Sequence, residues 1–473
     1  MIRFGTGGWR AVIGDEFTKQ NLQILAKAMA DKIHAEGVEN RTVIGYDRRF
    51  LSKESMQWMA VVLAAEGIEV ELINRSVPTP LVMFFVEKHG LSYGMMVTAS
   101  HNPAIYNGVK VFTLGGRDAD EVQTADIERY IVAVNPEKIR ALDYNKAVKE
   151  GKILEIWPMN EYLDSIIAAI NMDAIRNSDL KIALDPMYGV SETAIKTILI
   201  TARCAVTTIH ERHDTLFGGK LPAPNSDTLH ALQTEVVDGR YDLGIATDGD
   251  ADRLGVIDDK GHFLHPNDIL VVLYYYLLKY RGWRGDAVRS ICTTHLLDRV
   301  ASDFGQTSHE VPVGFKYVSA MMTKTDAIIG GESSGGLSVK GHIRGKDGVY
   351  AACLLVEMIA VTGMKLSQIM EEIWSKYGKM AFGEHSLRFS ADDKARIENL
   401  LMVSRKLPEL PWKIKRVSYE DGLILYLEDD SWISVRFSGT EPLLRIFSEF
   451  PTDEENRQAD KIFEHFLSLD QLR

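Results

Sequence analysis

The feature that most constrains the fold of this chain is a short apolar run, rich in β-forming residues, that recurs and each time stops in a polar, often glycine-bearing loop. It occurs at TVIGYDRR (42–49), GMMVTASHN (94–102), KIALDPMYG (181–189), DLGIATDGD (242–250) and AIIGGESSGG (327–336). Amphipathic helical stretches lie near these runs, and strands that alternate with helices are typical of α/β folds with largely parallel sheets. Ligands of such sheets collect in the loops beyond the carboxyl ends of the strands. These polar loops are therefore the expected functional sites.

Helical spacing of apolar residues predicts a helix over 18–36, after a threonine cap, and another over 52–66. A strand–turn–strand pattern over 413–433 and a last helix near 453–467 predict a small C-terminal α+β domain. The chain has 473 residues, which suggests three to four domains at about 100–200 residues each.

We expect three related α/β domains with mixed, largely parallel sheets, although no tandem repeat is visible by identity, and a C-terminal α+β domain. Their predicted limits are 1–150, 151–260, 261–376 and 377–473. The turn DDKGHF (258–263) is expected to close the second domain.

Composition argues against several partners. The 54 Lys and Arg against 66 Asp and Glu give a net charge of −12, whereas nucleic-acid backbones are held by a basic surplus. The longest apolar stretch (269–278) has ten residues, and spanning a bilayer takes about 20, so we expect a buried helix or strand and no membrane. The first residues show no signal peptide. Cys204, Cys292 and Cys353 form no CxxC pair, which favours a reducing, cytoplasmic location.

The sharpest motif is DGDADR (248–253), directly after an apolar run. Residues two apart in an extended segment point to the same side, so Asp248, Asp250 and Asp252 are expected to converge. At a separation of about 7 Å, each neighbouring pair would repel by about 2 kcal/mol at an effective dielectric of 20. Oxygen ligands suit Mg²⁺, and a solvated acidic loop is the alternative. An EF-hand is rejected because Arg253 and Asp259 occupy the positions of its Gly and Glu.

A second motif, TASHNP (98–103), places Ser100 at the end of another apolar run, with His101 beside it and Lys110 downstream. A serine at such a junction can be a nucleophile or a phosphate carrier, and a neighbouring His or Lys can move its proton. A plain Ser/Asn turn ended by proline is the alternative.

A third motif, GGESSGG (330–336), contains the G-x-S-x-G string of serine hydrolases, with Ser333 as its serine. That hypothesis requires a strand, a sharp turn and then a helix, but the sequel GLSVKG is too glycine-rich and β-branched to begin one. A polar loop that hydrogen-bonds a polyol such as a sugar fits better, and a glycine turn is the simplest alternative.

A fourth motif, RFSGTEP (436–442), combines glycine-loop amides, two hydroxyls and two arginines, Arg436 and Arg445, which suits a phosphate. As an isolated string it fits a plain turn equally well. The N-terminal GTGGWR presents Arg10 from a glycine loop but lacks the full dinucleotide fingerprint. GFK (314–316) and HIRGKD (342–347) add cations near the third motif.

Together, TASHNP, TDGDADR, GESSGG and RFSGTEP, in this order and about 80 to 150 residues apart, resemble the α-D-phosphohexomutase superfamily, which includes phosphoglucomutases and phosphomannomutases. The resemblance covers essentially the whole chain, one motif per domain, and implies that the four domains surround a central cleft. It also implies Mg²⁺ as cofactor and a hexose 1,6-bisphosphate as activator and intermediate.

The resemblance assigns roles residue by residue. Ser100 would carry the phosphoryl group, and Mg²⁺ would lie between its phosphate and the three aspartates. The expected catalytic residues are Ser100, His101, Lys110 and Arg10; the metal ligands are Ser100, Asp248, Asp250 and Asp252; the substrate-binding residues are Arg253, Gly314, Lys316, Glu332, Ser334, His342 and Lys346; and the phosphate-binding residues are Arg436, Ser438, Gly439, Thr440 and Arg445.

The sugar preference rests on finer likeness. VGFKY (313–317), LLDRVA (296–301) and HIRGKDG (342–348) look more like the glucose-preferring members. The chain departs from the family pattern at two places: it has GTGGWR instead of the commoner GTSGWR, and Gly336 instead of histidine. These departures leave a mannose, dual or pentose-phosphate substrate open. Ser333-Ser334 stands where glucosamine-preferring members commonly carry Gln–Ser. Sugar phosphates are the expected partners, for a monomer or homodimer.

Overall fold

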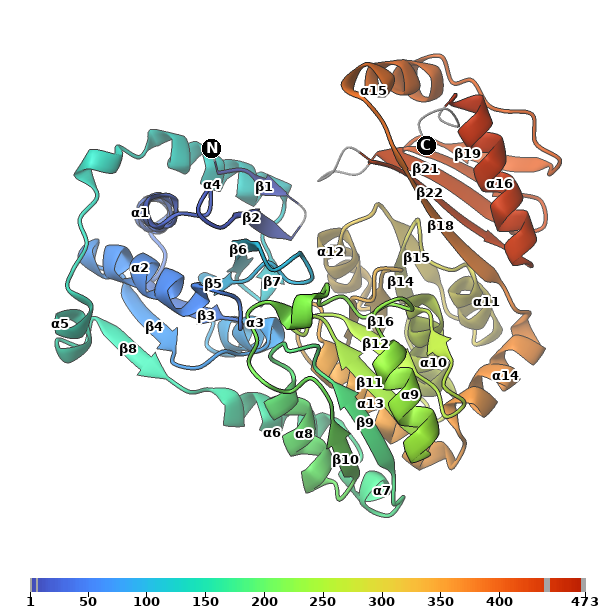
Figure 1. Ribbon diagram of the computed structural model, residues 1–473, viewed down its shortest axis with the longest axis horizontal. Coiled ribbons are helices and arrows are strands. Elements are labelled where there is room, and N and C mark those ends of the chain that lie inside the picture. Colours follow the sequence, from blue (N-terminus) through green and yellow to red (C-terminus); the bar gives the residue numbers. More distant parts are fainter. Residues whose placement is uncertain (1, 6, 438–442, 469–473) are drawn as a thin grey trace.

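Four β-sheets, each formed by a separate stretch of sequence, are the framework of the computed structural model, which describes residues 2–5, 7–437 and 443–468 (Figure 1). The chain runs from the first sheet through two smaller mixed sheets to a sheet at the C-terminus. The helices are α1 (Lys19–Glu36), α2 (Ser52–Ala65), α3 (Thr79–Lys88), α4 (Glu121–Ala133), α5 (Tyr144–Lys149), α6 (Met159–Ala169), α7 (Met172–Arg176), α8 (Glu192–Thr201), α9 (His230–Gly239), α10 (Pro266–Lys279), α11 (Leu296–Asp303), α12 (Phe315–Thr325), α13 (Gly348–Thr362), α14 (Leu366–Tyr377), α15 (Ala391–Glu398) and α16 (Asp453–Phe466).

The first sheet has eight strands in the order β1-β2-β6-β5-β3-β4-β8, with β7 paired to β6. Its parallel part joins β5, β3, β4 and β8, and the other pairs are antiparallel. The strands are β1 (Phe4–Gly5), β2 (Gly8–Val12), β3 (Arg41–Tyr46), β4 (Glu69–Ile73), β5 (Tyr93–Val97), β6 (Tyr106–Thr113), β7 (Arg117–Asp118) and β8 (Ile153–Ile156).

Strand β8 extends the first sheet beyond residue 150, the predicted end of the first domain. Its residues pair in parallel with those of β4, from Val70 opposite Ile153 to Ile73 opposite Ile156. The first sheet therefore continues into the range predicted for the second domain, because this connecting segment pairs with the edge of the sheet before the chain leaves it.

The second and third sheets are smaller. The order is β10-β9-β11-β12-β13 in the second and β15-β14-β16-β17 in the third. Their strands are β9 (Lys181–Asp185), β10 (Ala205–Thr208), β11 (Leu243–Thr247), β12 (Leu254–Ile257), β13 (Phe263–Leu264), β14 (Ala287–Ser290), β15 (Ser308–Val311), β16 (Ile329–Gly331) and β17 (Leu337–Val339). The predicted turn at 258–263 joins β12 to β13.

The first three sheets share one pattern. Each contains three neighbouring parallel strands followed by an antiparallel one: β4-β3-β5-β6, β10-β9-β11-β12 and β15-β14-β16-β17. In the first sheet β8 adds a further parallel strand beside β4. The three motifs occupy the same place in this pattern, between the third parallel strand and its antiparallel partner. The expectation of three related α/β units with mixed sheets is confirmed.

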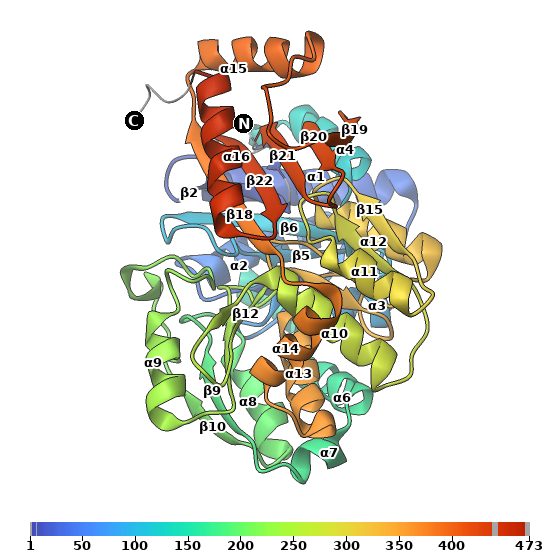
Figure 2. The same cartoon turned by 90° about the vertical axis from the view of Figure 1, so that its right-hand side faces the viewer.

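The C-terminal sheet is entirely antiparallel, in the order β18-β22-β21-β20-β19. Figure 2 shows α16 lying along β18 and β22, with α15 beside it. Its strands are β18 (Ala381–Arg388), β19 (Ile414–Ser418), β20 (Leu423–Leu427), β21 (Trp432–Phe437) and β22 (Leu443–Phe450). This is the predicted α+β domain.

One hydrophobic core links the first three sheets. It joins α3 from the first sheet, α6 and α8 from the second, and α10 and α13, which lie at the junction of the second and third. The apolar run 269–278 is the buried interior of α10, so the helix alternative holds. Ile424, Trp432 and Phe447 of the C-terminal sheet pack on Ile291 and Cys292 of the third domain.

The predicted helices at 18–36 and 52–66 correspond to α1, capped by the Thr18 side chain, and α2. Within the described ranges no single helix has the length and apolar character to span a membrane; α13 and α14 meet that test only as a pair bent by 83°.

Candidate active site

Ser100 lies in the loop between β5 and β6. Its backbone has a φ of +52°, in the left-handed region, and its side chain is buried. The hydroxyl Oγ donates to Asp248 Oδ2 at 2.7 Å and lies 3.3 Å from Nδ1 of His101. A hydrogen bond from the amide of Ser100 to Thr98 Oγ1, at 2.9 Å, holds the backbone from the other side. The predicted carrier serine and the first predicted metal ligand are therefore in direct contact.

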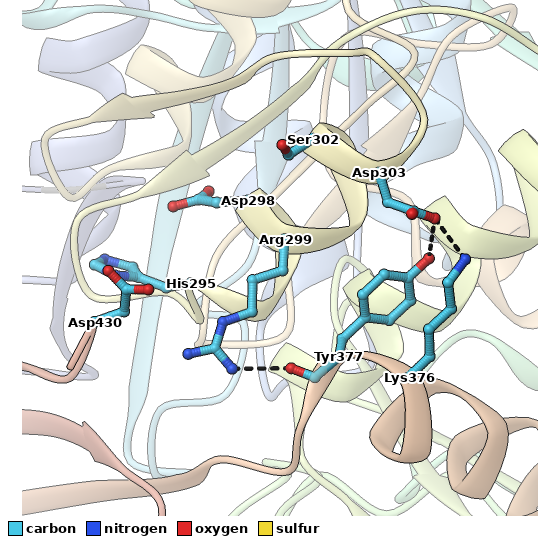
Figure 3. Close-up of a pocket in the computed structure, with 8 residues that line it drawn as sticks. All are labelled: His295, Asp298, Arg299, Ser302, Asp303, Lys376, Tyr377 and Asp430. Atoms are coloured by element: carbon cyan, nitrogen blue, oxygen red, sulfur yellow. Dashed lines mark hydrogen bonds and ion pairs between the residues drawn. The ribbon is translucent and has the colours of Figure 1, made fainter.

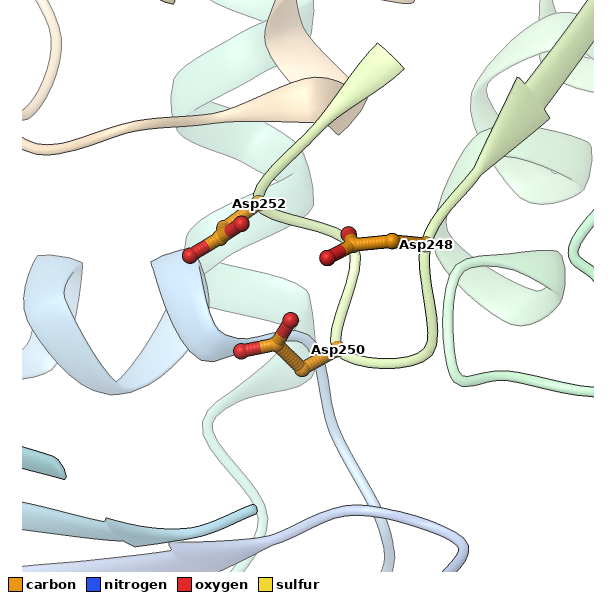
Figure 4. A group of neighbouring side chains, drawn as sticks. All are labelled: Asp248, Asp250 and Asp252. Atoms are coloured by element: carbon orange, nitrogen blue, oxygen red, sulfur yellow. The ribbon is translucent and has the colours of Figure 1, made fainter. Parts of the chain in front are cut away.

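Asp248, Asp250 and Asp252 lie in the turn between β11 and β12, and their side chains project from it toward one another (Figure 4). One carboxylate oxygen from each lies within 4.8 Å of the other two, and all three side chains are buried. The predicted convergence is present, but the predicted cause is wrong. The segment is a turn with Ala251 at φ +61°, not an extended strand, so the chain's reversal rather than alternation brings the carboxylates together.

Gly249 permits the loops of the first two domains to meet. A Cβ atom on this residue would lie 2.7 Å from the backbone oxygen of Ser100, closer than side-chain carbons approach. The amide of Thr79 also donates to the carbonyl of Asp250 at 2.9 Å, and that of Leu254 donates to Gly335 of the third domain at 3.3 Å. Backbone hydrogen bonds thus join the aspartate loop to Thr79 of the first domain and to the third motif, and Gly249 lets it approach the Ser100 loop closely.

Positive charge reaches the aspartates from two other domains. Lys110 Nζ lies 2.6 Å from Asp250 Oδ2 and 2.7 Å from Asp252 Oδ2. Lys346 Nζ lies 2.8 Å from the same Asp252 oxygen, and its stem passes so close to Gly336 that a Cβ there would lie 2.2 Å from it. Thus Lys110 of the first domain and Lys346 of the third neutralise negative charge on the aspartates of the second domain.

Two carboxylate oxygens of this group remain available. Asp250 Oδ1 and Asp252 Oδ1 are buried and have no hydrogen-bond partner among the residues that the structure describes. Buried oxygens without partners are unfavourable, and the convergence of three carboxylates offers the oxygen donors that a hard divalent cation prefers. The residues present therefore fit a metal ion.

The pKa values of Asp248 and Asp252 are shifted in opposite directions. Burial and the charges of the neighbouring aspartates raise the pKa of Asp248 well above its usual range. Burial opposes ionisation of Asp252 as well, but the positive charges of Lys110 and Lys346 outweigh it and hold its pKa well below that range. Without a bound cation, Asp248 is the member that resists carrying charge.

His101 stands among arginines. The charge of Arg253, then burial and the charge of Arg10, hold the pKa of His101 well below its ordinary value of 6.5. Its imidazole is therefore neutral at pH 7, the form that can accept a proton. The amide of Arg253 also donates to Asp248 Oδ1 at 3.1 Å. Arg10, on β2, lies within electrostatic reach of Asp250 and Asp252.

The third motif forms the β16–β17 hairpin, in which strand follows strand. The next element after Ser333 is strand β17 and not a helix, so the hydrolase alternative lacks the strand–turn–helix that it requires. Glu332 Oε1 accepts a hydrogen bond from the amide of Gly314 at 2.8 Å, which brings two predicted sugar-binding segments together. Ser334 is exposed to solvent.

Two predicted substrate-binding residues have other partners. Lys316 Nζ lies 2.6 Å from Glu121 Oε1 on α4, so it bridges the third domain to the first. His342 is buried: its Nε2 lies 2.8 Å from Asp347 Oδ2, and its ring packs near Phe84 and Tyr350. The His342 side chain is only 4% exposed in this structure, and its predicted sugar contact stays a prediction.

Arg436 and Arg445 lie directly opposite one another on β21 and β22. Like charges at paired positions are unfavourable, and each arginine has an acidic neighbour: Asp421 Oδ1 at 3.1 Å from Arg436 and Glu384 Oε1 at 3.6 Å from Arg445. Asp421 also accepts the amide of Val313 at 2.9 Å, which ties this pair to the third domain. The predicted Ser438, Gly439 and Thr440 lie outside the described residues.

A cavity of about 540 Å³ lies elsewhere, between α11, the end of α14 and the turn at Asp430 (Figure 3). None of the predicted site residues lines it; its lining is His295, Asp298, Arg299, Ser302, Asp303, Lys376, Tyr377 and Asp430. Lys376 and the Tyr377 hydroxyl both contact Asp303, so these polar groups are satisfied internally.

Comparison with known proteins agrees with this arrangement. Family models described as phosphoglucomutase/phosphomannomutase α/β/α domains I, II and III match residues 1–137, 160–261 and 265–377, and the model of the C-terminal domain matches 387–465. The chain belongs to the phosphoglucomutase/phosphomannomutase family. Both the resemblance and the predicted fold class are confirmed, and the chain is an intramolecular phosphotransferase of the phosphohexomutase class.

Similar members of the family carry different substrate names. A "Probable phosphoglucosamine mutase" of Methanobrevibacter smithii is 31% identical over 97% of this chain and 96% of its own length. A "Phosphoglucomutase/phosphomannomutase" of Thermococcus kodakarensis is 27% identical, with 96% of each chain covered. The crystal structure of a "putative phosphomannomutase" from Thermus thermophilus superposes with a TM-score of 0.86 at 30% identity and covers 99% of each chain.

Sequence reasoning missed three residues that shape this phosphohexomutase site. Thr79 donates its hydroxyl to Asp250 Oδ2 at 2.6 Å, Glu121 holds Lys316, and Asp421 holds Arg436. Thr79 follows β4, so the rule that sites lie beyond strand ends was the available signal. No comparable signal in the sequence marked Glu121 or Asp421. Glu121 lies 195 residues before its partner Lys316, and Asp421 meets Arg436 only when β20 pairs with β21.

The metal hypothesis predicts the effect of Asp250→Asn. This change removes a charge beside the available Oδ1 and should weaken Mg²⁺ binding and lower turnover by orders of magnitude, while the fold is retained. Calorimetric Mg²⁺ titration and steady-state assays measure both effects, with the exposed Asp238→Asn on α9 as the matched control. Wild-type Mg²⁺ affinity and rate in Asp250→Asn would show that the carboxylates do not form the metal site.

The charge around His101 predicts its titration. In the unphosphorylated, metal-free protein, His101 should remain neutral at pH 6.5, where an ordinary histidine is half protonated. Removing the nearby charge in Arg253→Gln should move the titration to higher pH, because the imidazolium is then less disfavoured. NMR of labelled histidine measures both titrations, and an ordinary midpoint in the unmodified protein would contradict this electrostatic account.

Proposed function

We propose that this enzyme interconverts a hexose 1-phosphate and a hexose 6-phosphate, with glucose as the preferred sugar, through a phosphoserine at Ser100 and a bound 1,6-bisphosphate. The observation that supports this most strongly is the 2.7 Å contact between Ser100 Oγ and Asp248 inside a carboxylate group with two oxygens available. A hydroxyl in this setting suits a phosphate carrier, because phosphoryl transfer depends on positioning and on cations near the oxygens.

In the proposed transfer, the bond between phosphorus and Ser100 Oγ breaks while a bond to a sugar hydroxyl oxygen forms. The hydroxyl loses its proton and Ser100 Oγ regains one, so a nearby group must exchange protons with the site. His101 is placed for this role, because its Nδ1 lies 3.3 Å from Ser100 Oγ. Lys110 and Arg253 supply fixed positive charge.

Asp248, Asp250 and Asp252 would hold Mg²⁺, which when bound supplies charge neutralisation for the phosphate oxygens. The three side chains are already gathered and buried, so little reorganisation is needed before the ion binds. Ser100 would add a ligand through its phosphate.

The phosphate that does not react needs its own site. Arg436 and Arg445 lie opposite one another and can bind a single anion between them, with the adjoining Ser438, Gly439 and Thr440 as further donors. After the first transfer, the bisphosphate must turn over so that its other phosphate faces Ser100. The same arginines would then hold the phosphate that was just transferred.

The GFK and HIRGKDG segments are the support for glucose as the preferred sugar. The names of similar proteins also include phosphoglucosamine mutase and phosphomannomutase, so these sugars are the competing substrates. The Glu332 carboxylate, fixed by the Gly314 amide, is placed to accept hydrogen bonds from sugar hydroxyls.

We place the enzyme in the cytoplasm, a proposal supported by its three cysteines, all free thiols in the structure.

Testing this function takes a panel of glucose, mannose, glucosamine and ribose 1-phosphates with Mg²⁺ and a trace of bisphosphate. Glucose 1-phosphate should give the highest kcat/KM, and intact-mass measurement should show one labile phosphoryl group that is absent in Ser100→Ala. Ser334→Ala, in the exposed part of the sugar loop, is a control that keeps the carrier. Retention of the phosphoryl group or of mutase turnover in Ser100→Ala would refute the proposal.

The distal phosphate site predicts the behaviour of Arg436→Ala. Charge-assisted bonds from arginine contribute on the order of 1.5–3 kcal/mol, so kcat/KM should fall by about 10- to 200-fold for both the 1-phosphate and the 6-phosphate. The bisphosphate should also escape more often, and its release per turnover can be measured directly. Arg416→Ala, on the same sheet but stacked on Tyr426, is the matched control. A defect confined to one isomer would contradict binding in both orientations.

A further inference from the structure

The loop after β3, within YDRR (46–49), ends beside the active site but has no role in the proposed chemistry. Its second arginine, Arg49, has a side chain with no exposed surface. We propose that Arg49 is a positioning residue that fixes the carrier loop, and with it Ser100 Oγ, for phosphoryl transfer. This inference rests on the proposed function of Ser100.

Arg49 donates four hydrogen bonds to backbone oxygens of the loop between β5 and β6 (98–105), called the carrier loop here, and of the first residue of β6. Nη2 donates to the carbonyls of Ser100 at 2.7 Å and Asn102 at 2.6 Å. Nη1 donates to those of Pro103 at 2.9 Å and Tyr106 at 3.0 Å. A planar guanidinium presents its donors in a rigid fork, so one side chain defines the positions of four peptide groups. A lysine has no such geometry.

Asp47 holds the loop from the opposite side. Its Oδ2 accepts the Thr98 hydroxyl at 2.6 Å, and the Thr98 oxygen in turn accepts the amide of Ser100 at 2.9 Å. The same Oδ2 lies 3.4 Å from Nε of Arg49. The carbonyl and the amide of Ser100 are therefore both fixed by one buried ion pair, Asp47–Arg49, at the carboxyl end of β3.

The hydrogen bonds from Arg49 and Thr98 restrain the backbone at Ser100, which has an unfavourable conformation. Ser100 has a left-handed backbone, which residues other than glycine adopt only when the surroundings enforce it. Phe217 of the second domain covers the guanidinium, with its ring centre 4.9 Å from Arg49 Cζ. The hydrogen bonds of Arg49 go to backbone carbonyls, and its charge also acts on Asp248 and Asp250. A lysine at this position keeps the charge but loses the fork, so Arg49→Lys isolates the effect on the placement of Ser100.

Misplacement of a reacting group by about 1 Å can cost about 100-fold in rate. We therefore expect Arg49→Lys, which keeps the charge but loses the fork, to lower kcat by about 100-fold while KM stays within about twofold. Single-turnover phosphorylation of Ser100 by the 1,6-bisphosphate should slow by the same factor. Amide hydrogen exchange at residues 100–102 should become faster, a readout that does not depend on activity.

Arg41→Lys is the matched control. Arg41 begins the same strand and pairs with Glu71 at 2.8 Å, at the end of β3 remote from Ser100. It should leave both kcat and amide exchange at residues 100–102 unchanged. If Arg49→Lys does not fold, Thr98→Val, which removes the acceptor for the Ser100 amide, is measured against the same criteria.

An unchanged kcat in Arg49→Lys, a rise in KM that accounts for the loss, or unaltered exchange at residues 100–102 would each overturn the inference. Failure of the proposed function is distinguishable, because the unmodified protein would then not accept a phosphoryl group on Ser100. In that case the exchange measurement alone decides whether Arg49 fixes this loop.

Discussion

Three buried carboxylates, each with an oxygen within 4.8 Å of the other two, need opposite charge from the domains that pack around them. Buried charges of one sign are strongly unfavourable unless opposite charges reach them. Here Lys110 comes from the first domain and Lys346 from the third, whereas the carboxylates belong to the second. The same ion pairs that complete the site therefore also join three domains, and a cation bound to the remaining oxygens would strengthen both.

A common sheet pattern explains how three domains supply one site. In each of the first three sheets, the motif follows the third parallel strand and precedes its antiparallel partner, so similar units present their loops at equivalent edges. The loops bear different chemical groups: the Ser100 hydroxyl, the three aspartate carboxylates and the Glu332 carboxylate. The C-terminal sheet is antiparallel throughout, and its paired Arg436 and Arg445 are the proposed site for a second anion.

The strand-ending loops and their residue types were predictable from sequence, because apolar runs and the spacing of motifs report local structure. That is why Ser100 and the aspartates were found, although the aspartates converge through a turn at Ala251 and not by alternation. Contacts between domains were not predictable in this way. Lys316 meets Glu121 and Lys346 meets Asp252 across domain boundaries, because these partners lie far apart in sequence and come together only when the domains pack.

We propose that Ser100 and the three aspartates form one metal-and-phosphate site. Electron–nuclear double resonance on the phosphorylated protein loaded with Mn²⁺, an ion that accepts the same oxygen ligands as Mg²⁺, tests this proposal. We expect a strong ³¹P coupling from direct coordination of the Ser100 phosphate, lost when Asp250→Asn removes the ion. Bound Mn²⁺ with no phosphorus coupling in the phosphorylated protein would contradict it.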